Sequence, residues 1–173
     1  MKMTELIRQA SENAHQGFEG SIEDVDDELV LWQPGGTAHP MGSRYAHMVV
    51  VEDIVIQEVL QGATALCDSG FAGKAGLDDP HRAIITTEEW AHHVQVDMGA
   101  LRENAQATYA QTNEYLQSIE DDDLEREIDL SNAGLGVMSL GMVLLTLVFA
   151  HGRDVIGEIS ATKGVKGLKG YPF

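Results

Sequence analysis

A long run without charge constrains the fold more than any other feature of this sequence. No charged side chain occurs from residue 130 to residue 150 of the 173-residue chain, and residues 137–150 are almost wholly apolar. An uncharged run of this length is at the threshold for a membrane span, but it also suits the central helix of a soluble bundle. The segment before the run is acidic and lacks the basic anchor expected beside a span. Small and polar residues also dilute the run, namely Ser131, Asn132, Gly134, Gly136, Ser139, Gly141 and Thr146. We therefore expect a buried helix and no membrane association.

Four segments have apolar residues at helical spacing, and together they cover most of the chain. They are residues 4–17, 41–61, 86–119 and 138–162. Long connections join the second segment to the third and the third to the fourth, and the last connection has room for a short extended segment. This pattern predicts an all-α fold, a four-helix bundle with long crossover connections, formed by residues 1–173 as one domain. In the fourth segment, Leu144, Leu145 and Val148 are expected to face the core or an interface.

The charge balance excludes two classes of partner. Eleven Lys and Arg residues stand against 28 Asp and Glu residues, which gives a formal net charge of −17. A nucleic-acid-binding protein needs a basic face, and so does a protein that docks on an anionic membrane surface. The one cysteine, Cys67, has no partner for an internal disulfide. The N-terminal residues lack the apolar run of a secretory signal, so we expect a cytoplasmic protein.

Two of the seven histidines lie in apolar surroundings on different predicted helices. His47 is flanked by the apolar stripe of the second segment, and His151 directly follows the sequence LLTLVFA of the fourth. A single buried histidine is usually a hydrogen-bonded core residue. A pair on facing helices can instead bind a divalent metal ion, because neutral imidazole is the commonest protein ligand for such ions. A catalytic zinc-like site has three protein ligands and one open position, so two histidines are one ligand short.

Two segments resemble the DinB-like (YfiT-type) family of four-helix bundles. Residues 151–173 (HGRDVIGEISATKGVKGLKGYPF) resemble the end of these proteins, and residues 28–53 (ELVLWQPGGTAHPMGSRYAHMVVVED) resemble their Leu-x-Trp stretch followed by a helix with Ala-His and then Glu. The resemblance implies a metal ion bound by one histidine of the second helix and two residues four apart on the fourth. Some members are thiol-dependent metalloenzymes related to mycothiol-dependent maleylpyruvate isomerase and bacillithiol transferases, and many have no assigned reaction.

Transferred residue by residue, the family pattern leaves the metal site incomplete. The ligand of the second helix corresponds to His47. On the fourth helix, the first ligand corresponds to His151 and the second falls on Val155; in the alternative register His151 is the second ligand and the first falls on Leu147. The site is then lost, or Asp154 replaces the missing ligand, or the two imidazoles bind metal weakly with water and an exogenous ligand. The candidate metal residues are His47, His151 and Asp154, and the ion is zinc or nickel, bound weakly or not at all.

The function implied is that of a DinB-like protein of unassigned reaction, a metal-assisted, thiol-dependent transferase or isomerase with a reduced metal site. The alternative is a non-catalytic bundle that has lost the metal site and binds a small ligand or a protein. Whether the chain is an enzyme stays open at this point. We expect a homodimer and a small-molecule or thiol ligand.

Three further side chains have both a structural and a functional interpretation. Glu52 is a packing or solvated carboxylate, or it accepts a hydrogen bond from a metal-binding imidazole. His93 and Asp97, four residues apart, form an exposed charged pair or a metal site. Cys67 has no basic neighbour in the sequence that would activate it as a nucleophile.

Overall fold

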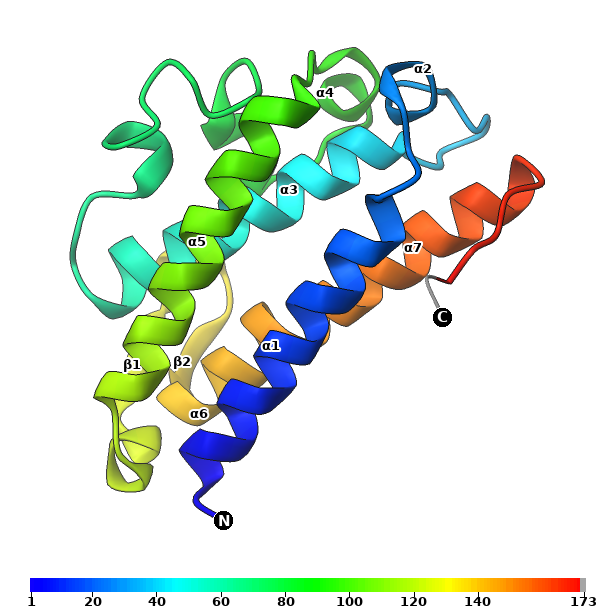
Figure 1. The fold of residues 1–173 in the computed structure, drawn as a ribbon. Helices are drawn as coiled ribbons and strands as arrows, with labels where there is room; N and C mark the ends of the chain where they lie inside the picture. Colours follow the sequence, from blue (N-terminus) through cyan, green and yellow to red (C-terminus); the bar gives the residue numbers. More distant parts are fainter. Residues whose placement is uncertain (172–173) are drawn as a thin grey trace.

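The four predicted helical segments form a bundle in the computed structural model, which describes residues 1–171 (Figure 1). The first segment is α1, Met3–Ile22, and the second is α3, Met41–Ile54, which continues into a π-helical turn at Val55–Leu60. The third is α5, Met98–Ser118. The fourth consists of α6, Leu140–Val143, a π-helical turn at Leu144–Ala150 and α7, His151–Val165. The all-α four-helix bundle is thereby confirmed.

The predicted third helix is interrupted. Residues 86–119 form α4, Glu88–His93, and α5, which are separated by an extended stretch whose Val96 bridges to Leu77. The side chain of Asp97 accepts a hydrogen bond from Ala100 N and so caps α5. The prediction of one continuous helix is therefore wrong, because a capping residue lies inside the periodic pattern. The loop residue Gly76 packs directly on α5: its φ is +85°, and an added Cβ would lie 2.3 Å from Leu101 N.

The connections contain short elements. A short helix α2, Asp27–Val30, precedes α3, and 3₁₀ turns occur at Leu66–Asp68, Pro80–Ile84, Asp121–Glu125 and Ser131–Ala133. The extended segment expected before the fourth helix is an antiparallel hairpin of β1, Glu127–Leu130, and β2, Gly136–Ser139. The 3₁₀ turn before β1 also supports α1, since the Asp121 carboxylate accepts hydrogen bonds from the first amides of that helix.

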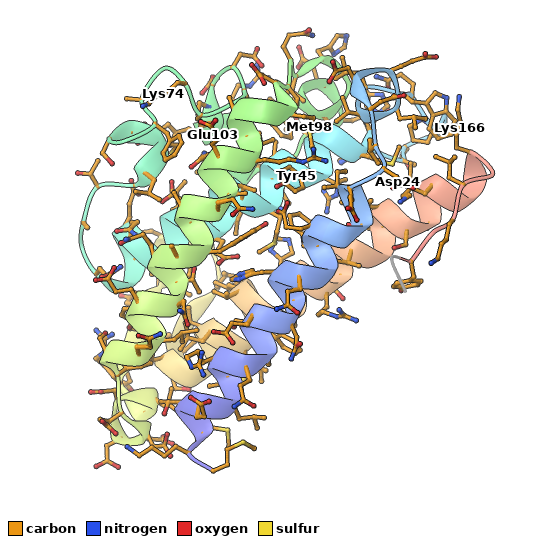
Figure 2. All side chains as sticks on the ribbon, in the orientation of Figure 1. Asp24, Tyr45, Lys74, Met98, Glu103 and Lys166 are labelled. Carbon is orange, nitrogen blue, oxygen red and sulfur yellow. The ribbon has the colours of Figure 1, made fainter. Side chains whose placement is uncertain are left out.

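Packing places α1 against α5 and α7, and α3 against the same two helices (Figure 1). Figure 2 shows the side chains on this framework, among them Tyr45 of α3. The apolar run in the fourth segment buries Leu140, Leu144 and Val148, whereas Leu145 is 44% exposed. Leu145 therefore does not pack in the core, and its expected place at an interface stays a prediction. Within residues 1–171, Leu140–Val165 is the helix that is long and apolar enough to cross a membrane by length and composition, and 39% of its most apolar window is buried in the bundle.

Candidate metal centre

His47 of α3 and His151, the first residue of α7, meet between the two helices. Their Nε2 atoms are 3.0 Å apart, and the rings are nearly perpendicular, with centroids 4.8 Å apart. His47 is buried and His151 is half-buried. The π-helical turn that ends at Ala150 sets the orientation of His151, because an i→i+5 turn rotates the residues after it relative to an α-helix. The structure therefore brings together the two histidines that their apolar flanks singled out.

The hydrogen bonds assign the protons on the two rings. His47 Nδ1 lies 2.6 Å from the carbonyl oxygen of Ala83, which can only accept, so Nδ1 carries the proton. In the neutral ring Nε2 of His47 is then an acceptor, and His151 Nε2–H donates to it. This leaves His151 Nδ1 as an unprotonated nitrogen that is buried without a hydrogen-bond partner among the described residues.

Burial keeps both imidazoles neutral. It lowers the pKa of His47 to about 4; the hydrogen bond to Ala83 raises this pKa, and the neighbouring His151 and Arg44 lower it further. The pKa of His151 is also lowered, first by burial and then by Arg44. Neutral imidazole is the form that binds metal ions, so both rings are ready to act as ligands at neutral pH.

A cationic side chain lies next to the imidazoles and is itself held in place. The Arg44 guanidinium forms an ion pair with Glu158 of α7 and donates a hydrogen bond of 3.3 Å to Thr86 Oγ1. A second contact of 3.5 Å joins it to Nδ1 of His39. Glu158 offsets the charge of Arg44, which would otherwise oppose a divalent cation at the site.

No third ligand is in place within residues 1–171. Val155 is fully buried in the aliphatic core, and Asp154 is exposed on α7, where its charge acts on His151 without a direct contact. Leu147 is half-buried and has no donor atom. No group of three or more His, Cys, Asp or Glu side chains is close enough to hold a metal ion in this part of the chain.

The distance between the two Nε2 atoms suits a shared metal ion, but metal binding would leave one imidazole N–H without a hydrogen-bond acceptor. Bonds of about 2.1 Å at a tetrahedral angle space two nitrogens about 3.4 Å apart, so the rings would separate by only a few tenths of an ångström. Metal binding would also move the His151 proton to Nδ1, which has no acceptor. A buried, unsatisfied N–H costs about 1–3 kcal/mol, which lowers metal affinity by roughly one order of magnitude or more.

The other sequence candidates lie elsewhere. Glu52 is buried away from His47 and accepts hydrogen bonds from His15 of α1 and Thr112 of α5. The interpretation of Glu52 as an acceptor for a metal-binding imidazole is therefore wrong. His93 donates through Nδ1 to the backbone oxygen of Glu89, and its predicted pairing with Asp97 is not formed.

Cys67 is buried, and burial beside Asp53 raises the pKa of its thiol to about 12. It stays protonated at neutral pH, as expected for a structural cysteine. Sequence reasoning missed His15, because its partner Glu52 lies 37 residues away on another helix.

The sequence model of the DinB superfamily matches residues 10–153. Among solved structures, the crystal structure of a conserved protein from Enterococcus faecalis has the same fold, with a TM-score of 0.80 and 22% sequence identity over 95% of this chain and 97% of that one. No curated protein sequence matches the chain significantly.

Proposed function

Because this chain belongs to the DinB superfamily, we propose that it acts through a divalent metal ion, zinc or nickel, held by His47 and His151. The observation that carries the proposal is the meeting of the two Nε2 atoms at 3.0 Å. The carbonyl of Ala83 supports it, since its hydrogen bond with His47 Nδ1 leaves the Nε2 lone pair for a metal. Metal-binding histidines commonly make such a bond with their second nitrogen.

Asp154 is the proposed third ligand. It is three residues after His151 on the same helix, so a change of rotamer can bring its carboxylate to the same side of α7. Its exposure leaves it free to reorient. A carboxylate would also offset the charge of a divalent ion beside Arg44.

The reaction we propose is a metal-assisted, thiol-dependent transfer or isomerisation of a small electrophile. A bound divalent ion lowers the pKa of a coordinated thiol or water and so supplies a nucleophile at neutral pH. Arg44 is placed to pair with an anionic substrate group, because its guanidinium lies beside both imidazoles and is kept oriented by Glu158 and Thr86. The half-buried position of His151 leaves an approach for a ligand from solvent.

A second candidate function is a non-catalytic bundle that binds a small ligand or a protein without metal. Two observations favour it. Val155, one of the two positions where the family resemblance puts the missing ligand, is an aliphatic side chain in the core. The hydrogen bond between the imidazoles also satisfies His47 without an ion.

Calorimetric titration of tag-free protein with zinc and nickel chlorides separates the two functions. We expect one weak site per chain in the wild type, no binding in His47→Ala, and binding weakened severalfold in Asp154→Asn. The exposed His93, changed to Ala, is the matched control and should leave affinity unchanged. No saturable site in the wild type, or equal affinity in wild type and His47→Ala, would contradict the metal function and favour the non-catalytic one.

A further inference from the structure

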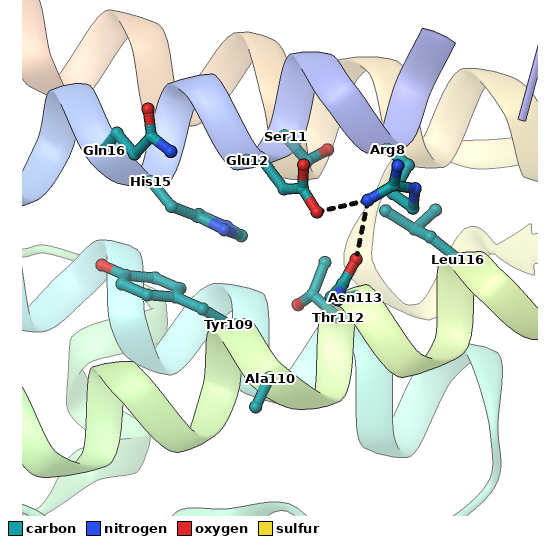
Figure 3. Close-up of a pocket in the computed structure, with 10 residues that line it drawn as sticks. All are labelled: Arg8, Ser11, Glu12, His15, Gln16, Tyr109, Ala110, Thr112, Asn113 and Leu116. Atoms are coloured by element: carbon teal, nitrogen blue, oxygen red, sulfur yellow. Dashed lines mark hydrogen bonds and ion pairs between the residues drawn. The ribbon is translucent and has the colours of Figure 1, made fainter. Parts of the chain in front are cut away.

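A second polar site lies on the other side of the bundle, in the seam between α1 and α5. A pocket of about 270 Å³ opens there (Figure 3) and is continuous at His15, Gln16 and Tyr109 with a larger hollow of about 550 Å³. The two lobes follow residues 8–23, which are α1 from Arg8 onward and the residue that caps its end, Glu23. At about 1.5 Å per residue, the seam is roughly 20 Å long. It is separate from the metal centre, which lies between α3 and α7.

A buried carboxylate lies behind two side chains that line the seam, His15 and Thr112. Glu52 is 1% exposed, and its Oε1 accepts hydrogen bonds from His15 Nε2 at 2.8 Å and from Thr112 Oγ1 at 2.5 Å. The His15 ring stacks on Tyr109 with centroids 4.0 Å apart, which fixes the plane of the imidazole. With Nε2 bound to Glu52, Nδ1 is the remaining acceptor of His15 for a group in the pocket.

An unsatisfied hydroxyl also lines the pocket. Ser11 is 2% exposed, and its Oγ has no hydrogen-bond partner in the described part of the chain. It lies one helical turn before His15, on the same side of α1. A buried hydroxyl without a partner is costly, and a ligand that donates or accepts a hydrogen bond there would remove the cost.

The charge of the seam favours a cation. Glu12, Glu19 and Glu23 line it from α1, at spacings of seven and four residues that keep them on one side of the helix. Its two arginines are already engaged: Arg8 pairs with Glu5 and Glu12, and Arg102 donates to the backbone oxygen of Ile22.

Glu19 is fixed in position as a carboxylate. The hydroxyls of Tyr45 and Tyr109 both donate to its Oε1, at 2.7 Å and 3.0 Å. With Glu52 behind His15, four carboxylates outnumber the two guanidinium groups of the seam, so its net charge attracts cations.

From this arrangement we propose that the α1–α5 seam binds a linear polyamine, an aliphatic chain with several ammonium groups. The ammonium groups would donate to His15 Nδ1, to Ser11 Oγ and to the carboxylates of Glu19 and Glu23. The methylene segments between them would lie against the ring of Tyr109. An elongated seam with separated acceptors suits several spaced cations better than a single one.

Calorimetric titration with spermidine at about 0.15 M salt tests the proposal with matched charge variants. Glu12→Gln/Glu23→Gln removes two carboxylates from the seam, and Asp122→Asn/Glu127→Gln removes two exposed carboxylates outside it. We expect about a tenfold loss of affinity in the first pair and less than a twofold change in the second. Equal losses in both pairs would show diffuse attraction to an acidic protein and would overturn the proposal.

Ser11→Ala provides a second, independent readout. Removal of an unsatisfied hydroxyl should leave the melting temperature unchanged or raise it, while spermidine affinity falls severalfold. Unchanged affinity in Ser11→Ala would overturn the role of the pocket around His15. His47→Ala should bind spermidine like the wild type, so failure of the metal proposal and failure of this one are distinguishable.

Discussion

The buried imidazole of His47 makes the stability of the protein depend on pH in a calculable way. The pKa of His47 is about 4 in the folded chain, against about 6.5 for an unfolded histidine. Between these values the unfolded chain binds a proton at this site and the folded chain does not. Linkage then requires that the contribution of His47 to the free energy of unfolding is fully present above about pH 6.5. This contribution is lost as the pH falls toward 4. The free energy of unfolding should therefore fall by about 2 kcal/mol at this residue between pH 7 and pH 5.

Urea unfolding followed by far-UV circular dichroism at the two pH values measures this loss. The variant His47→Gln has no titrating group at the position, so its loss between pH 7 and pH 5 should be smaller than that of the wild type by about 2 kcal/mol. Titrating groups that do not contact His47 contribute equally to both proteins and cancel in the comparison. The raised pKa of buried Asp53 is one such contribution.

His93→Gln is the control, since His93 is exposed and its ring donates a hydrogen bond to Glu89 of the same helix. It should show the same loss between pH 7 and pH 5 as the wild type. If His47→Gln and the wild type lost the same stability, His47 would not be held neutral by burial, and the proton assignment of the pair would be wrong.

Three further predictions follow from the packing. Leu144→Ala, at a fully buried position, should lower the free energy of unfolding by about 2–5 kcal/mol, measured by urea unfolding. The control Asp122→Ala, at an exposed position, should lower it by under about 0.5 kcal/mol. Equal losses in the two variants would contradict the burial of Leu144. Val155→His places an imidazole one turn after His151 and should tighten zinc binding at least tenfold, measured by calorimetry. The same change should lower the stability of the metal-free protein. Unchanged zinc affinity would mean that position 155 does not face His47 and His151. The protein should be a monodisperse homodimer in detergent-free buffer by light scattering, and recovery in the membrane fraction would contradict a buried fourth helix.

The helices were largely predictable from the sequence, because apolar spacing records which side of a helix is buried. The break before α5 was not, since residues 94–97 continue the apolar pattern and Asp97 gives no sign that it caps a new helix. The exposure of Leu145 was not predictable for a related reason. The segment around it is apolar on every side, and such a helix carries no periodic signal to separate Leu145 from its buried neighbours Leu144 and Val148.

The candidate site was predictable only in part. His47 and His151 were identified because His47 is flanked by apolar residues and His151 directly follows an apolar stretch. The contact between their Nε2 atoms was not predictable, because it depends on how α3 and α7 pack. The network of His15 and Glu52 was beyond sequence reasoning, because hydrogen bonds between helices leave no local pattern. Glu52 looked like a neighbour of His47, yet five residues turn a helix by about 140°, which directs it to α5 instead.

The central claim is that His47 and His151 share one divalent ion through their Nε2 atoms. Two-bond ¹H–¹⁵N correlation spectra of the imidazoles of ¹⁵N-labelled protein test it directly. Without metal, we expect His47 to be protonated on Nδ1 and His151 on Nε2. Zinc should shift the Nε2 resonances of both residues together, with one stoichiometric end point, and should move the His151 proton to Nδ1. A zinc titration that shifts only one of the two, or that shifts other histidines first, would contradict the claim.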